Sequence, residues 1–116
     1  MTAFIEPIVG RYVHVEIDGE TNRIYFEENG EGIPLVCLHT AGSDARQWRH
    51  LLTDEEFTKH FRVIAFDMPW HGKSNPPDSG YGTEYKLTTA SYTATIRAVC
   101  KALDLDKPVV MGCSIG

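Results

Sequence analysis

The chain has 116 residues, the length of one domain, and its 11 Lys and Arg against 16 Asp and Glu give a net charge of −5. No basic cluster interrupts this mild acidity, which argues against a nucleic-acid-binding face. No apolar run approaches the roughly 18 residues of a membrane helix, and the first residues lack the pattern of a signal peptide, so we expect a cytoplasmic protein.

The first part of the chain has the pattern of two antiparallel strands. Residues 13–18 alternate between apolar and polar side chains, as in a strand with one buried face. Asp18-Gly19 predicts a turn, and a second strand is expected over residues 23–28. This segment therefore predicts a hairpin at the edge of a sheet.

The rest of the chain alternates between strand and helix patterns. Short continuous apolar runs at 34–38, 63–66 and 109–111 are typical of parallel strands that are covered on both faces. Helical spacing of apolar side chains predicts helices over 44–52 and 89–103. The order predicts an α/β fold, with a mostly parallel sheet, an antiparallel N-terminal hairpin and flanking helices.

Two details of the helices bear on the later argument. Asp44 and Gln47 have the spacing of a variant capping box at the start of the first helix, in which Trp48 is expected to belong to the core. In the second helix a stripe of apolar side chains predicts the buried face: Tyr92, Ile96, Val99 and Leu103.

Three motifs follow the predicted parallel strands. Gly112-Cys113-Ser114-Ile115-Gly116 is a GxSxG directly after a strand, the pattern of a nucleophile elbow. His39-Thr40-Ala41-Gly42 follows an earlier strand and can aim backbone amides at the oxyanion of a tetrahedral intermediate. Residues 67–74, with the pattern Asp-x-Pro-x-x-Gly-x-Ser, follow the strand between them. Together, on these elements and in this order, the motifs predict nucleophilic catalysis by a serine.

These motifs resemble the N-terminal half of an α/β-hydrolase-fold protein, and within that superfamily most resemble the esterase, lactonase and carbon–carbon-bond hydrolase group. The resemblance covers residues 11–116, so residues 1–116 are expected to form the N-terminal portion of a single α/β-hydrolase domain. It implies the strand order 1-2-4-3-5 for the five predicted strands.

The resemblance also implies roles for individual residues. Ser114 matches the nucleophile, and the backbone amides of Ile115 and Ala41 match the oxyanion hole, with Thr40 as a second candidate beside Ala41. His39 and Gly42 are expected to shape the same loop.

Four further residues need an interpretation: Asp67, His71, Cys113 and Trp70. Asp67 is expected to organise its loop rather than to serve as the acid of a triad, and His71 to stabilise that loop. Cys113 is expected to be a small buried residue. Trp70 departs from the family pattern, as does Thr40, because both stand where many members have glycine.

In this fold the acid and the histidine of the triad follow the serine, so both are expected on a second chain, a C-terminal fragment of the same hydrolase that also carries the cap. This chain alone is then expected to be inactive, with an unpaired apolar edge near residues 109–112. An engineered or natural split, proteolysis and self-cleavage near Ser114 all remain open as causes, and so does a homo-oligomer of the assembled protein.

The leading hypothesis is a serine hydrolase that cleaves an ester, a lactone or a similar carbonyl substrate. A carbon–carbon-bond hydrolase for diketone-type substrates and a non-catalytic binding module on the same fold are the alternatives. No metal or organic cofactor is expected, because the triad performs its own proton transfers. The three cysteines, Cys37, Cys100 and Cys113, are too widely spaced for a CxxC motif and are expected to be reduced.

Overall fold

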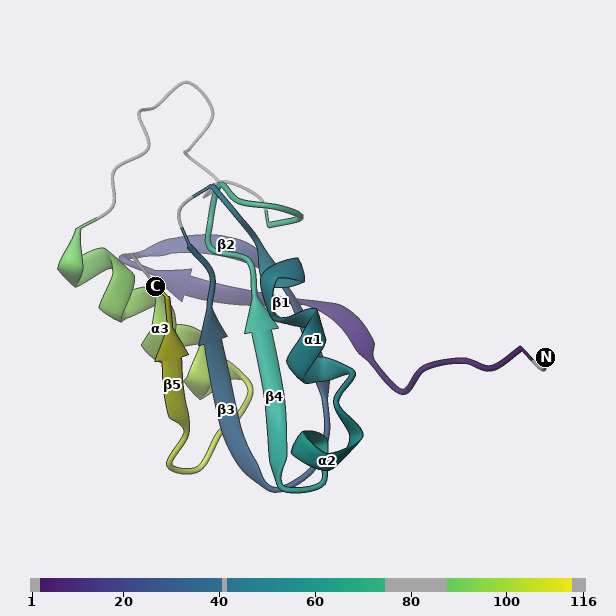
Figure 1. Cartoon of the computed structure of the whole chain (residues 1–116). Coiled ribbons are helices and arrows are strands. Elements are labelled where there is room, and N and C mark those ends of the chain that lie inside the picture. The colour runs from purple at the N-terminus through teal and green to yellow at the C-terminus, as the bar shows by residue number, and fades with distance from the viewer. Residues whose placement is uncertain (1–2, 41, 75–87, 114–116) are drawn as a thin grey trace.

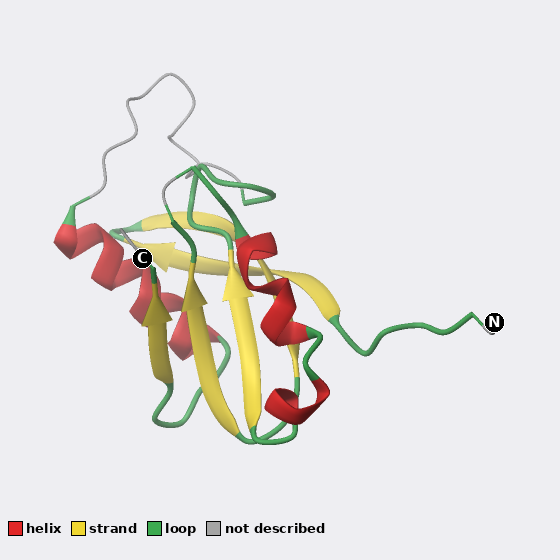
Figure 2. Ribbon diagram, in the orientation of Figure 1, coloured by secondary structure: helices red, strands yellow, loops and turns green. Residues whose placement is uncertain are grey.

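The structure is a computed structural model that describes residues 3–40, 42–74 and 88–113. Within these residues, five strands form one mixed sheet in the order β1-β2-β4-β3-β5 (Figure 1). Helices cover both faces of the parallel part of the sheet (Figure 2). The α/β class and the strand order predicted from the sequence are confirmed.

The antiparallel part is the hairpin of β1 (Val9–Ile17) and β2 (Glu20–Asn29), which pair along their whole lengths. Asp18 and Gly19 form the turn with φ angles of 51° and 80°. Positive φ at both central residues is the geometry of a type I′ turn, whose twist suits two antiparallel strands. The predicted hairpin is confirmed, with a second strand longer than expected.

The parallel part consists of β3 (Ile33–Leu38), β4 (Phe61–Phe66) and β5 (Val109–Gly112). Consecutive side chains of β3 and β4 point to opposite faces of the sheet, and both sets are buried, which explains the continuous apolar runs. One face carries Val36, Leu38, Ile64 and Phe66; the other carries Leu35, Cys37, Val63 and Ala65.

Helix α3 (Thr89–Ala102) covers the first of these faces, where Val99 is fully buried. Its predicted stripe packs on the core as expected, with Tyr92, Ile96 and Leu103 partly buried. The opposite face is covered by the 3₁₀ helix η1 (Ala45–Trp48) and by α1 (Arg49–Leu52), with α2 (Glu55–Thr58) beyond them. Helix α2 is not predicted by the sequence pattern.

The helix predicted over 44–52 is divided into η1 and α1. Asp44 caps the first turn as expected, but its side chain accepts from the amide of Arg46, at 2.9 Å. The capping box is wrong in its other half, because Gln47 Oε1 accepts from Thr40, seven residues earlier. The side chain of Gln47 has therefore found a partner outside its own helix.

β5 lies at the edge of the sheet and pairs with β3. Its consecutive residues Val109 and Val110 point to opposite faces, and the two residues are 48% and 45% exposed. Cys113 is exposed too, so its predicted burial is wrong: nothing among the described residues covers this edge.

No described helix combines the length and the apolar character that a membrane crossing requires.

Candidate active site

The loops that follow β3 and β4 lie at one end of the sheet, beside the end of β5. Because these strands are parallel, their carboxyl ends coincide: Leu38 is level with Phe66 on one side and with Gly112 on the other. Figure 1 shows the three arrowheads pointing to the same edge. Ligands of open α/β sheets bind at this edge, so the three strands that precede the predicted motifs end where a site is expected.

His39 connects the two loops. Its ring is buried, Nδ1 lies 2.8 Å from the carbonyl oxygen of Thr40, and Nε2 accepts from the amide of Met68 at 3.0 Å. These bonds select the neutral tautomer with its proton on Nδ1, since a carbonyl only accepts and an amide only donates. Burial lowers the pKa of His39, which favours the same neutral form.

Thr40 is the next residue, and it contacts three others: Gln47, Ser43 and His39. Its amide donates to Gln47 Oε1 at 2.8 Å, and its hydroxyl lies 3.2 Å from the same atom. Its carbonyl oxygen accepts from the amide of Ser43 at 3.1 Å as well as from His39. Gly42 lies in this turn with φ of 74°, in the left-handed region that favours glycine.

Asp67 is the centre of the second loop. Its buried carboxylate accepts from the amide of Ala45 at 2.6 Å and from that of Lys73 at 2.7 Å. Burial raises the pKa of Asp67, and the bonds from Lys73 and Ala45 act in the opposite direction. Asp67 thus joins the start of η1 to the loop after β4, as the resemblance implies for a loop-organising residue.

Ser74 extends this connection to the antiparallel part of the sheet. Its hydroxyl donates to the carbonyl oxygen of Asp67 at 2.6 Å and accepts from the amide of Tyr25 in β2 at 2.9 Å. The last residue of the Asp-x-Pro-x-x-Gly-x-Ser motif is therefore a buried polar bridge between its loop and β2.

The backbone of the same loop explains two other motif positions. Gly72 has φ of 51°, and a Cβ atom there would overlap the carboxylate of Asp67. Trp70 has φ of 73°, a conformation that is costly for a residue with a Cβ atom. Trp70 is therefore a position of backbone strain, which the glycine that the resemblance implies for many family members would avoid. His71 lies beside His39, with ring centroids 4.9 Å apart.

A cavity of about 260 Å³ lies on the β2 side of these loops, between Asp67 and the hairpin. Its walls carry a charged pair, in which Arg49 donates to both carboxylate oxygens of Glu27, at 3.0 and 2.7 Å. The bonds from Arg49 lower the pKa of Glu27. Burial, reinforced by the bond to Glu27, raises the pKa of Tyr25 to about 12. The ion pair thus joins β2 to α1 beside the two loops.

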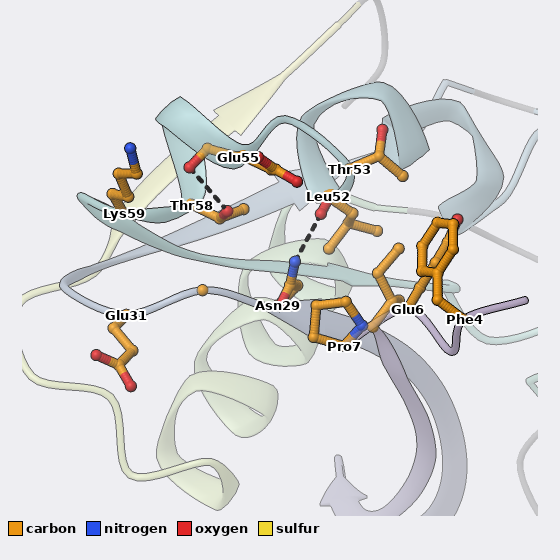
Figure 3. A pocket seen from close by; sticks show the side chains of 12 residues that line it. Phe4, Glu6, Pro7, Asn29, Glu31, Leu52, Thr53, Glu55, Thr58 and Lys59 are labelled. Carbon is orange, nitrogen blue, oxygen red and sulfur yellow. Dashed lines mark hydrogen bonds between the residues drawn. The ribbon is translucent and has the colours of Figure 1, made fainter. Parts of the chain in front are cut away.

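The larger described cavity, about 710 Å³, lies at the opposite end of the sheet (Figure 3). It is lined by the segment before β1, by the end of β2 and by α1 and α2, and the side chain of Asn29 donates to the carbonyl oxygen of Leu52 across it at 2.8 Å. Because it adjoins the amino ends of β3 and β4, it is not where this sheet architecture places a reacting group.

Across the described ranges, no three His, Cys, Asp or Glu side chains are grouped so as to hold a metal ion.

The predicted site residues divide into two groups. The structure brings His39, Thr40 and Gly42 together in one loop. Ser114, Ile115 and Ala41 lie outside the described residues. The contact between Gln47 and Thr40 was not predicted from the sequence. The feature that could have indicated it is a glutamine shortly after the motif of residues 39–42.

Comparison with known proteins identifies the family of this chain. A statistical model described as the alpha/beta hydrolase fold matches residues 33–116, which is more than half of the chain. The chain belongs to the alpha/beta hydrolase fold family. Its described strands, loops and helices are those of the N-terminal part of that fold.

The curated relatives of this α/β hydrolase chain include enzymes for several substrates. It is 50% identical over 50 residues to the (E)-2-((N-methylformamido)methylene)succinate hydrolase of Acinetobacter baylyi, covering 43% of this chain and 18% of that protein. It is 30% identical over 115 residues to the 2-hydroxy-6-oxononadienedioate/2-hydroxy-6-oxononatrienedioate hydrolase of Escherichia coli, covering 96% of this chain and 38% of that one.

Two solved structures are also similar. The N-acyl homoserine lactonase AidH, complexed with N-butanoyl homoserine, superposes with a TM-score of 0.74 at 31% identity, over 91% of this chain and 37% of that one. The epoxide hydrolase VrEH1 from Vigna radiata superposes with a TM-score of 0.76 over 99% and 33%, and at 23% identity it supports the fold alone. The chain spans between 18% and 38% of the length of these four proteins.

The contact between Gly72 and Asp67 can be tested with two alanine variants. Gly72→Ala and Gly42→Ala both place a Cβ atom at positive φ, which costs roughly 1–2 kcal/mol. Only at Gly72 does the new atom meet the Asp67 carboxylate, whereas Gly42 faces open space. We expect urea denaturation to show a loss of unfolding free energy larger by about 1–3 kcal/mol for Gly72→Ala. Equal losses would contradict the contact.

The buried neutral His39 predicts a pH dependence of stability. Its pKa is lowered in the folded protein, so the unfolded chain binds more protons and the free energy of unfolding rises with pH. We expect stability to fall as pH drops from about 7 to about 5, through the ordinary histidine pKa of 6.5. His39→Gln should flatten this dependence, and the exposed His14→Gln should retain it. Asp67, whose pKa is raised, contributes with the opposite sign at lower pH.

Proposed function

We propose that this chain carries the nucleophile and the oxyanion loop of a serine hydrolase that cleaves an ester, a lactone or a similar carbonyl substrate. Here the oxyanion loop is residues 39–44. The observation that carries the proposal is the position of this loop, held by hydrogen bonds beside the carboxyl end of β5. The GxSxG sequence follows that strand directly. A nucleophile and its oxyanion donors have to meet at this place.

In the proposed reaction Ser114 attacks the carbonyl carbon and its proton passes to a histidine base. The oxyanion of the tetrahedral intermediate accepts from the amides of Ala41 and Ile115. Each such donor typically contributes about 3 kcal/mol of transition-state stabilisation. The intermediate then expels the alcohol, which takes the proton from the histidine. Water, activated by the same histidine, hydrolyses the acyl-enzyme and restores the serine.

His39 is unsuited to be this base. Both ring nitrogens are engaged, one by the Thr40 carbonyl and one by the Met68 amide. Losing either bond would leave a backbone group of the loop without its partner. We therefore propose that the base and its orienting acid belong to polypeptide other than these 116 residues, and that a further part of the same hydrolase supplies them.

The exposed edge of the sheet supports this assignment of a partner. Val109 and Val110 point to opposite faces of β5, and both are nearly half exposed. A parallel strand is normally covered on both faces. The pattern fits an edge that another strand and its helices would cover, and the relatives extend well beyond the matched region.

A carbon–carbon-bond hydrolase is the second candidate. The observation that favours it is the 30% identity, over 96% of this chain, to the Escherichia coli 2-hydroxy-6-oxononadienedioate hydrolase. The same nucleophile and oxyanion loop would serve a ketone carbonyl. Turnover of a 2-hydroxy-6-oxo acid without turnover of a matched ester would favour this candidate over the first.

Labelling with a fluorophosphonate tests the catalytic serine. In the protein purified together with its partner segment, we expect one adduct on Ser114, because only an activated serine displaces the fluoride. Ser114→Ala should abolish the adduct. Cys113→Ala is the matched control, since it removes the exposed neighbouring thiol and should leave labelling intact.

Mass spectrometry of the intact and the digested protein locates the adduct. Absence of labelling in the assembled protein, or equal labelling of Ser114→Ala, would contradict the serine hydrolase. It would leave a non-catalytic binding module on this fold as the better account.

A further inference from the structure

The two peptide groups that flank Thr40 are fixed by separate hydrogen bonds. The amide of Thr40 donates to Gln47 Oε1 at 2.8 Å. The carbonyl oxygen of Thr40 accepts from the amide of Ser43, at 3.1 Å, and lies 2.8 Å from Nδ1 of His39. The backbone of Thr40 is therefore held on both sides of its Cα atom, at the amide and at the carbonyl oxygen.

The backbone of Gln47 is fixed by its buried neighbours and by a hydrogen bond. It lies in η1 between Ala45 and Trp48, which are 2% and 8% exposed. Its own amide donates to the carbonyl oxygen of Asp44 at 3.1 Å. The amide of Ala45, at the start of the same helix, is bound by the buried carboxylate of Asp67. The backbone that carries Gln47 is thus tied to Asp67, at the centre of the second loop.

Gln47 also binds the side chain of Thr40, at a position where the resemblance implies glycine in many family members. Thr40 brings a hydroxyl that lies 3.2 Å from the Oε1 atom that also binds its amide. One acceptor therefore takes both donors of Thr40. The hydroxyl is held toward η1.

From these contacts the structure assigns to Gln47 the role of positioning residue for the oxyanion loop. The assignment rests on the proposed function. Gln47 engages the amide of Thr40, so that amide does not serve the oxyanion, and the donor from this loop is the amide of Ala41. The bonds from Ser43 and His39 hold the Thr40 carbonyl oxygen, and with Gln47 they fix the described side of the oxyanion loop.

Gln47→Met tests the assignment, because methionine has a similar length and lacks the amide oxygen. In the assembled protein we expect kcat to fall about 10- to 100-fold, since a displaced oxyanion donor slows the chemical step. KM should stay within about twofold. The affinity for a boronic acid, which forms a tetrahedral adduct on the serine, should fall by a similar factor.

Two control variants accompany this measurement. His50→Met places the same new side chain at an exposed position of α1, three residues after Gln47, and it should retain wild-type kcat within about twofold. Thr40→Val removes the hydroxyl and keeps the amide bond to Gln47, so its loss of kcat should be smaller than that of Gln47→Met. Urea denaturation of each variant separates loss of folding from loss of positioning.

Several results would overturn the assignment. Wild-type kcat in Gln47→Met would do so, as would a rise in KM at constant kcat or an unchanged affinity for the boronic acid. These results would leave the serine hydrolase intact provided that the wild-type protein is labelled at Ser114. If the wild-type protein is neither labelled nor active, the proposed function fails, and the role of Gln47 fails with it.

Discussion

The buried carboxylate of Asp67 is the interaction on which the arrangement of the loops depends. Its two oxygens bind the amides of Ala45 and Lys73, so it joins the helix that follows β3 to the loop that follows β4. A carboxyl group buried in this position needs both amides as partners, because an unpartnered polar group is costly to bury. Gly72 leaves the space that the carboxylate occupies, and Ser74 carries the connection on to β2.

The connection has a chemical consequence at the other loop. Asp67 fixes the start of η1, η1 presents Gln47, and Gln47 holds Thr40, while His39 joins Thr40 directly to Met68. Catalysis by an oxyanion hole depends on donors that are already in place before charge develops, so that no reorganisation is needed during the reaction. In the proposed hydrolase, the buried polar contacts of the two loops provide this preorganisation.

The sequence predicted the parts of the fold that depend on local pattern. Continuous apolar runs located β3 and β4 because both faces of these strands are buried, and the motif after each strand located its loop. The failures concern partners that only the folded chain brings together. Gln47 has the spacing of a capping residue, yet its oxygen binds Thr40 across the loop. Cys113 was expected to be buried, but in the described residues the edge of β5 has no cover. Helix α2 has only four residues, too few to produce a periodic pattern.

The most direct test of this account is a crystal structure of the assembled protein with a boronic acid bound to Ser114. The account predicts that one oxygen of the tetrahedral adduct accepts from the amides of Ala41 and Ile115. It also predicts that the amide of Thr40 remains on Gln47 Oε1. An adduct oxygen bound to the amide of Thr40, with Gln47 displaced, would contradict the account, and so would an adduct that lies away from the oxyanion loop.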